Sequence, residues 1–249
     1  MLILLPPSET KRPGGRGRPL DSSALAFAAL APQRDAVVDA LVALSADEDR
    51  AARVLKLGAT QRGEIAVNAA LRQAPTMPAI DRYTGVLFDA LDAGSLDGTE
   101  RRWLGRHAAI HSAPFGLVGA LDQIPAYRLG AAVSLPALPS PQRVWADAVT
   151  AALAAEAPSF VLDLRSEAYA ALGPVPPSIA SVYVRVVSER PDGAVRALNH
   201  FNKHAKGALT RRLAQDRPRV SSVRGFVRWA DAAGVRVRPG ADGELELFA

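Results

Sequence analysis

The sequence predicts an α+β fold: one domain over residues 1–249, in which a mixed β-sheet core is surrounded by helices. Short apolar runs rich in Val, Ile and Leu alternate along the whole chain with longer segments of helical periodicity. No repeat of fixed period and no long linker divides the 249 residues, of which 49% are hydrophobic. A chain of this length and composition can bury one sizeable core.

The N-terminal half is expected to begin with a buried strand and then to be mostly helical. Leu2–Leu5 is short and apolar and is stopped by Pro6, and a glycine- and proline-rich loop follows over residues 11–20. Asp21 is a capping residue type at the start of the next segment. Capping and helical periodicity predict helices over residues 21–30, 34–46, 47–57, 63–71, 83–91 and 99–106.

The C-terminal half mixes the two kinds of element. Apolar and β-branched runs predict strands over residues 107–113, 127–135, 159–164, 178–188 and 194–200. Helical spacing predicts helices over residues 141–157, 199–215 and 222–234, and a short helix that opens at Ser166. Residues 235–249 are expected to close the fold as a β-hairpin with its turn at Gly240–Gly243.

The helix expected over residues 199–215 has two faces. The apolar face repeats every four residues and consists of Phe201, Ala205, Leu209 and Leu213. The opposite face carries Asn199, Lys203, Lys206 and Thr210. Glycine inside a helix costs about 1 kcal/mol relative to alanine, so Gly207 indicates close packing or the close approach of a ligand.

Positive charge is concentrated in two places. The chain has a formal net charge of +5, from 30 Lys and Arg against 25 Asp and Glu. Residues 196–228 alone contain nine basic residues and one acidic residue, and a second cluster comprises Lys11, Arg12, Arg16 and Arg18. Such clusters attract phosphate, whether free or on nucleic acid, although a solvated helix face is an equally simple explanation.

The composition also excludes several classes of protein. The chain has no cysteine, so it has no disulfide partner, no cysteine-based zinc site and no thiol chemistry. The opening apolar run is too short for the core of a signal peptide, and no segment reaches the roughly 18 apolar residues of a membrane span. We therefore expect a cytoplasmic protein that has no membrane partner.

Five segments, taken in order, resemble the motifs of the YaaA family of bacterial peroxide-stress proteins. They are LILLPPSETK at the start of the chain, RYTGVLFDAL with Tyr83, HSAPFGLVGALDQIPAYRL with Tyr127, VLDLRSEAY with Ser166, and HFNKHAKGALTRR with Lys203. The resemblance covers nearly the whole chain. It implies a sheet core wrapped in helices, a positive cleft, a helix-hairpin-helix element, binding of double-stranded DNA, and resistance to peroxide through limitation of free intracellular iron.

The same segments bring cationic and hydroxyl side chains next to glycine, which suits the binding of phosphate oxygens. We expect Lys11, Arg128, Lys203 and Lys206 to converge on one basic cleft, because a turn after a buried strand is a common anion site. The full set of candidate cleft residues is Ser8, Lys11, Tyr83, Thr84, Gly85, Tyr127, Arg128, Ser166, Tyr169, Lys203, Lys206, Gly207 and Arg211.

Two partners fit a basic cleft of this kind. A long, open groove would favour double-stranded DNA, whereas a closed pocket would favour an enzyme that acts on a nucleotide or another phosphorylated small molecule. Residues 47–71 suggest either a helix-hairpin-helix or ordinary helix packing, because Gly58 and Gly63 are five positions apart rather than two. The sequence names no catalytic residue, since no nucleophile and base form a recognisable pair.

The histidines give little reason to expect a metal. His107 and His111, like His200 and His204, are four residues apart, a spacing that can share a metal on a helix. Neither pair has an HExxH glutamate or an evident third ligand. We expect no metal site and no cofactor.

Overall fold

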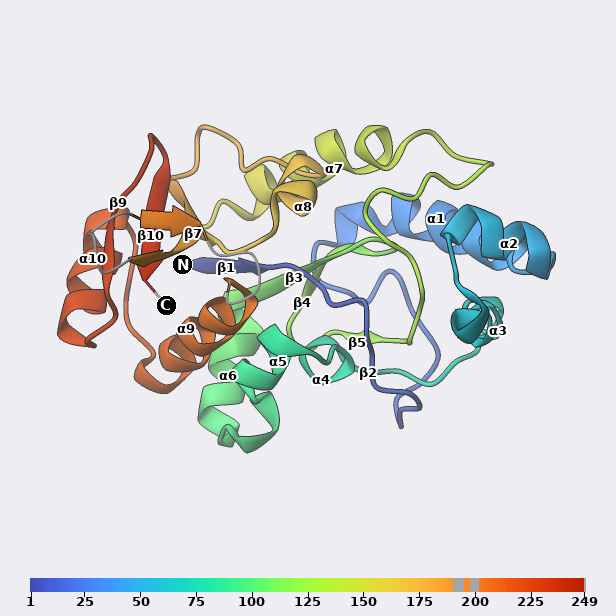
Figure 1. The fold of residues 1–249 in the computed structure, drawn as a ribbon, viewed down its shortest axis with the longest axis horizontal. Helices are drawn as coiled ribbons and strands as arrows, with labels where there is room; N and C mark the ends of the chain where they lie inside the picture. Colours follow the sequence, from blue (N-terminus) through green and yellow to red (C-terminus); the bar gives the residue numbers. More distant parts are fainter. Residues whose placement is uncertain (190–194, 198–201, 249) are drawn as a thin grey trace.

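A computed structural model describes residues 1–189, 195–197 and 202–248 of the chain, and a mixed β-sheet forms its centre (Figure 1). Seven strands follow one another across the sheet: β4 (Gly116–Gly119), β3 (Ala108–Ser112), β1 (Leu2–Leu5), β6 (Val161–Asp163), β7 (Ser181–Glu189), β10 (Glu244–Phe248) and β9 (Val237–Pro239). An eighth strand, β8 (Val195–Ala197), pairs with β7. The short strands β2 (Met77–Pro78) and β5 (Gln123–Ile124) form a separate antiparallel pair.

The five central strands of the sheet run parallel. β1 pairs with β3 on one side and with β6 on the other, and the parallel order continues through β7 to β10. The chain therefore leaves β1 toward β3 and later returns to β6 on the opposite side of β1. A change of direction of this kind leaves a crevice at the carboxyl ends of the strands, where parallel sheets commonly bind ligands.

Helices cover both faces of the sheet. In Figure 1, α5, α6 and α9 lie on one side of β1, α7 and α8 lie on the other, and α10 lies beside β9. The helices are α1 (Ala31–Leu44), α2 (Glu48–Leu55), α3 (Gly63–Ala69), α4 (Ala79–Arg82), α5 (Val86–Leu91), α6 (Gly98–His107), α7 (Pro141–Glu156), α8 (Glu167–Ala171), α9 (Asn202–Asp216) and α10 (Val223–Ala232). Single 3₁₀ turns occur at Ala28–Leu30, Ala59–Gln61 and Ala93–Ser95.

The apolar opening of the chain is explained by the position of β1. Ile3, Leu4 and Leu5 are fully buried because helices cover both faces of a central parallel strand. Each such side chain contributes about 1.5–3 kcal/mol to folding through burial. None of the helices in the described part of the chain is both long and apolar enough to span a membrane.

The predicted α+β class is confirmed, and most predicted elements lie within a few residues of their positions in the structure. The strand predicted over residues 127–135 is wrong, because the main chain of Arg128 binds the side chain of Asn68 instead of a neighbouring strand. The helix predicted over residues 21–30 is also wrong: Phe27 adopts a left-handed conformation, and only the turn Ala28–Leu30 is helical.

Strand β4 is not predicted, because its sequence GLVG is short and rich in glycine. The predicted hairpin at the C-terminus is present as β9 and β10, and Gly243 supplies the positive φ of its turn. The expectations for Asn199, His200 and Phe201 lie outside the described residues.

Candidate functional site

The turn after β1 directs Lys11 inward. Pro6 and Pro7 end the strand, and the Lys11 ammonium folds back to donate hydrogen bonds to the carbonyl oxygens of Ser8, at 3.0 Å, and Glu9, at 3.1 Å. The Lys11 Nζ atom lies 4.0 Å from the centre of the Tyr127 ring. Lys11 is thus held against an aromatic wall directly beyond the end of the central strand.

This environment weakens the hold of Lys11 on its proton. Burial is the main cause, followed by the positive charge of Arg128, and together they lower the pKa of Lys11 to about 7. The carboxylates of Glu64 and Glu9 oppose the shift, and Arg82 adds to it. A substantial fraction of Lys11 is therefore a neutral amine at neutral pH.

The buried rings of Tyr83 and Tyr127 lie next to the Lys11 ammonium. The hydroxyls of Tyr83 and Tyr127 share a hydrogen bond of 2.8 Å, and the Ser112 hydroxyl donates to Tyr127 at 3.1 Å. Burial raises the pKa of Tyr83 to about 12 and also raises that of Tyr127, so both side chains stay neutral. Tyr83 and Tyr127 thus form the aromatic wall against which Lys11 lies.

A hydroxyl cluster fixes the same turn from the other side. The Thr84 hydroxyl donates to the Thr10 hydroxyl at 3.0 Å, and the Thr10 hydroxyl donates to the Thr84 carbonyl at 3.3 Å. Gly85 has a φ of 93°, and a Cβ atom there would lie 3.2 Å from the Ser8 hydroxyl. Glycine at position 85 thus allows α5 to start close to the turn.

The carboxyl end of β6 carries a buried ion pair. Arg165 and Asp163 are joined by side-chain hydrogen bonds of 2.9 and 2.7 Å, and the Arg165 side chain is fully buried. The Arg165 guanidinium also donates to the His111 Nδ1 atom at 3.0 Å and to the Gly173 carbonyl at 2.9 Å. This network fixes the backbone immediately before Ser166.

Lys206 reaches the same end of β6 from α9. Its Nζ atom donates to the Arg165 carbonyl at 3.2 Å and lies 5.2 Å from the centre of the Tyr183 ring. Burial lowers the pKa of Lys206 to about 8, although the carboxylate of Asp163 opposes the shift. The half-buried Lys11 and the buried Lys206 therefore approach the carboxyl ends of neighbouring parallel strands.

These strand ends open into a cavity of about 650 Å³, which we call the strand-end cavity. Its walls include five cationic side chains and one carboxylate: Lys11, Lys56, Arg128, Lys203, Lys206 and Glu9. Seven of the predicted residues line it: Ser8, Lys11, Arg128, Ser166, Tyr169, Lys203 and Lys206. The four cations expected to converge are thus brought to one cavity.

The other predicted residues lie outside the lining. Tyr83, Thr84, Gly85 and Tyr127 form the support behind Lys11 described above. Gly207 packs against α5 so closely that a Cβ atom would overlap the Leu87 carbonyl oxygen.

Arg211 also serves the packing of α9 on α5. Its guanidinium donates to the carbonyl oxygens of Leu91 and Asp92, each at 3.0 Å, at the end of α5. Gly207 and Arg211 therefore position α9, which in turn presents Lys203 and Lys206 to the cavity.

Sequence reasoning missed Lys56, which ends α2 in a left-handed conformation and lines the cavity beside Leu55. Arg165 is also not predicted, because nothing near it in the sequence marks it as buried. Its burial depends on Asp163, on His111, which is 54 positions away in the sequence, and on the order of the strands. No local pattern marks either residue.

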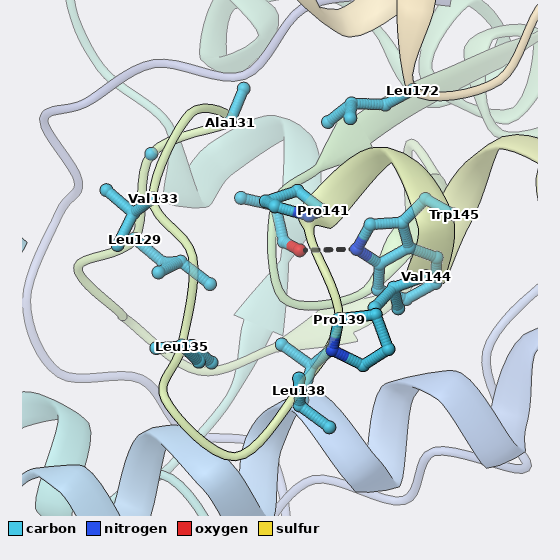
Figure 2. A pocket seen from close by; sticks show the side chains of 13 residues that line it. Leu129, Ala131, Val133, Leu135, Leu138, Pro139, Pro141, Val144, Trp145 and Leu172 are labelled. Atoms are coloured by element: carbon cyan, nitrogen blue, oxygen red, sulfur yellow. Dashed lines mark hydrogen bonds between the residues drawn. The ribbon is translucent and has the colours of Figure 1, made fainter.

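A second, smaller pocket is apolar and shares a loop with the strand-end cavity. Figure 2 shows Pro139, Pro141, Val144 and Trp145 around it, with the Trp145 indole N–H donating to the Ala113 carbonyl at 3.1 Å. Leu129, Gly130, Ala131 and Val133 border both spaces. The loop over residues 129–133 is thus a thin wall between a cationic cavity and an apolar pocket.

The buried His111 should make the protein sensitive to mild acid. Burial, and then the charge of Arg165, hold the pKa of His111 well below its usual value, and its Nε2 atom has no partner among the described residues. Below about pH 6.5 the unfolded chain gains a proton here that the folded protein does not, so this site should lower the free energy of unfolding by about 1.4 kcal/mol per pH unit until the folded-state pKa is reached.

Urea unfolding of wild type and His111→Gln from about pH 4.5 to 7 measures this contribution. The free energy of unfolding of the variant should depend less steeply on pH in that interval, whatever its absolute stability. Parallel curves for the two proteins would show that His111 is protonated as easily in the folded state as in the unfolded chain.

Within residues 1–189, 195–197 and 202–248, no three His, Asp or Glu side chains lie together in a way that could hold a metal ion. His107 stacks on Trp103, with its Nδ1 atom 2.8 Å from the Trp103 carbonyl, and His111 binds Arg165. The pairing of His200 with His204 lies outside the description, because His200 is not described.

The fold and the cavity together place the chain among single-domain α+β proteins whose central parallel strands end at a cation-lined cavity. The sequence model of a family described as "Peroxide stress protein YaaA" matches residues 1–237. The chain therefore belongs to the YaaA family of peroxide-stress proteins, which confirms the resemblance carried by the five segments.

Relatives in other bacteria match over most of their length. A UPF0246 protein of Corynebacterium efficiens is 46% identical over 231 residues, which cover 91% of this chain and 90% of the relative. A UPF0246 protein of Corynebacterium glutamicum is 42% identical over 241 residues, covering 95% and 94%. One of Streptomyces coelicolor is 42% identical over 219 residues, covering 86% and 82%.

Proposed function

We propose that this peroxide-stress protein is an enzyme that binds and acts on a phosphorylated small molecule of nucleotide size in the strand-end cavity. The observation that carries the proposal is the cavity itself, at about 650 Å³, with five cations and one carboxylate in its walls. Small-molecule sites usually measure about 300–1,000 Å³ and occur where the order of parallel strands changes direction. Both conditions are met at the ends of β1 and β6.

The positions of Lys206 and Lys11 favour a small ligand over a duplex backbone. Lys206 is only 3% exposed, and Lys11 is half-buried against the Tyr127 ring. Phosphates on the outside of a double helix are bound by exposed cations, whereas a small phosphorylated molecule can enter a cavity and meet buried ones. Desolvated lysines also suit an enzyme, because they release and accept protons near neutral pH.

Double-stranded DNA is the second candidate, and one observation favours it. Leu55 and Lys56, at the end of α2, line the strand-end cavity, so a duplex bound at the α2–α3 pair would lie at its mouth. The Gly58 N–H, which a helix-hairpin-helix would offer to a phosphate, instead donates to the Gln61 side chain at 3.1 Å. DNA contact would then depend on the exposed Lys56 and Lys203.

We propose that the part played in peroxide stress, including any limitation of free iron, follows from the reaction in this cavity. On this proposal, a variant that no longer binds the phosphorylated ligand should also fail to protect cells from peroxide.

Calorimetry at physiological ionic strength tests the proposed ligand class. ATP, ADP and pyrophosphate should bind, and adenosine should bind at least about tenfold more weakly, because the cations of the cavity act on phosphate. Lys206→Met keeps the alkyl stem and removes the charge, so it should weaken ADP binding by about tenfold or more, equivalent to about 1.4 kcal/mol.

Arg228→Met is the matched control, because Arg228 is an exposed cation on α10 and does not line the cavity. It should leave ADP binding unchanged. Equal binding of adenosine and ATP, or equal losses in the two variants, would contradict the proposal. Tight duplex binding that ADP does not displace would favour the DNA candidate instead.

A further inference from the structure

Lysine is rare in this chain, and its positions are concentrated. Of the 30 basic residues, 26 are arginines and only four are lysines: Lys11, Lys56, Lys203 and Lys206. All four line the strand-end cavity, although they come from the turn after β1, the end of α2 and helix α9. The protein thus builds most of its positive surface from arginine and places its lysines around one space.

This division has a chemical meaning, because the two side chains differ in more than shape. Arginine binds phosphate at least as well as lysine does, but its guanidinium stays protonated and is a poor nucleophile. A cavity that only had to attract phosphate could be lined by arginine throughout. A primary amine in the cavity adds the ability to lose a proton and attack a carbonyl carbon.

The hydrogen bonds of Lys11 leave one position on its nitrogen for the lone pair that such an attack requires. Its Nζ atom donates two hydrogen bonds, to the Ser8 and Glu9 carbonyls, which account for the two N–H groups of a neutral amine. The fourth tetrahedral position then holds the lone pair. The charged groups that act on Lys11 are Arg128 and Arg82, which favour the neutral form, and Glu64 and Glu9, which oppose it.

A neutral hydroxyl is available in the same cavity. Tyr169 lines the strand-end cavity, and its phenol makes no hydrogen bond to another residue within the described ranges. Burial raises the pKa of Tyr169, so the hydroxyl keeps its proton and can donate a hydrogen bond to a carbonyl oxygen of the ligand.

We infer that Lys11 forms an imine with a phosphorylated aldehyde or ketone bound in the strand-end cavity, an assignment that rests on the proposed function and names its substrate class. The Lys11 lone pair attacks the carbonyl carbon and forms the C–N bond, and the carbonyl electron pair moves to oxygen, which takes up the first of the two amine protons. The hydroxyl of the resulting carbinolamine then leaves with the second amine proton as water, and the nitrogen electron pair completes C=N. Hydrolysis reverses the step, and no oxidant or reductant is consumed.

Reductive trapping on the full-length wild-type protein tests the inference. Pyridoxal 5′-phosphate serves as a phosphorylated aldehyde probe and 5′-deoxypyridoxal, which has a free aldehyde and no phosphate, as its counterpart, each followed by cyanoborohydride and peptide mass mapping. We expect one adduct, on Lys11, formed at least about tenfold faster with the phosphorylated probe and suppressed by ADP. The rate should rise through about pH 7, which follows the lowered pKa of Lys11.

The other amines are internal references in the same digest. We expect Lys56 and Lys203, whose side chains are exposed, to be modified more slowly than Lys11, and the amine of Met1, which does not line the strand-end cavity, should not respond to ADP. Lys11→Arg keeps a cation and should form no adduct at this position. If that variant does not fold, the wild-type peptide map and pH profile still decide the result.

The outcomes separate this inference from the proposed function. Adducts on Lys56, Lys203 and the N-terminal amine with Lys11 unmodified would overturn the imine, and calorimetric binding of ADP in the same preparation would leave the phosphorylated ligand in place. Trapping on Lys11 that is equally fast with 5′-deoxypyridoxal, together with no binding of ADP, would overturn the phosphorylated substrate class. Binding of neither ADP nor pyrophosphate and no adduct on Lys11 would overturn both.

Discussion

Asp163→Asn should lower the free energy of unfolding by about 3–5 kcal/mol, because it leaves the Arg165 charge buried without its counter-ion. Arg165 is fully buried. The Asp163 carboxylate accepts hydrogen bonds from the Arg165 backbone N–H and from two nitrogens of the Arg165 guanidinium. In the variant, the side-chain NH2 group of asparagine would replace one of the carboxylate oxygens and would face an N–H group of Arg165. The loss would be a large fraction of the 5–15 kcal/mol that is typical of a domain.

Denaturant unfolding of Asp163→Asn, Arg165→Met and the double variant measures this effect. The double variant should be less destabilised than the sum of the single variants, since it removes the buried charge together with its partner. Arg62→Met is the exposed control: its ion pair with Asp49 is 2.9 Å long, but both side chains are solvated, so the change should cost less than about 1 kcal/mol. A loss of that small size in Asp163→Asn would show that water reaches Arg165.

The part of the site that follows β1 can be predicted from sequence because its causes are local. An apolar run before two prolines fixes where the strand ends, and the residues that follow must then lie at the edge of the sheet. The two faces predicted for α9 are only partly right. Lys203 is exposed, but Lys206 and Thr210, predicted opposite Leu209 and Leu213, are buried with them, because Lys206 precedes Leu209 by three positions and Leu213 by seven.

Strand order, by contrast, depends on contacts between distant segments. No feature of SFVLDL shows that β6 lies directly beside β1, and that neighbourhood is what brings Ser166 and Tyr169 to the same cavity as Lys11. The position of the loop over residues 129–133 also depends on a distant segment, because the Asn68 side chain that binds the Arg128 main chain is 60 positions away in the sequence.

The neighbour of Gly207 also could not be predicted from the sequence. Glycine inside α9 indicates close approach, but the sequence leaves open whether the neighbour is a ligand or another helix. The structure answers that the Leu87 carbonyl of α5 occupies the space beside Gly207. The residue therefore contributes to the cavity through the position of α9 and not through contact with a ligand.

Gly207→Ala should therefore destabilise the protein and weaken ligand binding together. A methyl group at position 207 would overlap the Leu87 carbonyl oxygen and lie 3.0 Å from the Ala90 Cβ atom, so α9 must move away from α5. Overpacking of this kind costs about 1–3 kcal/mol or more, which outweighs the gain of about 1 kcal/mol in helix propensity. We expect a value at the upper end of that range, because backbone atoms cannot rotate out of the way.

Movement of α9 would also displace Lys206 from the Arg165 carbonyl, so we expect ADP affinity to fall by about tenfold or more even in the folded fraction. Thermal unfolding and calorimetry measure the two effects separately. Gly63→Ala is the matched control, since a Cβ atom at the start of α3 would meet nothing within 4 Å, and it should be neutral or stabilising by up to about 1 kcal/mol. If Gly207→Ala behaved like Gly63→Ala in both measurements, α5 and α9 could not be as closely packed as the structure places them, and the position of Lys206 in the cavity would not depend on that contact.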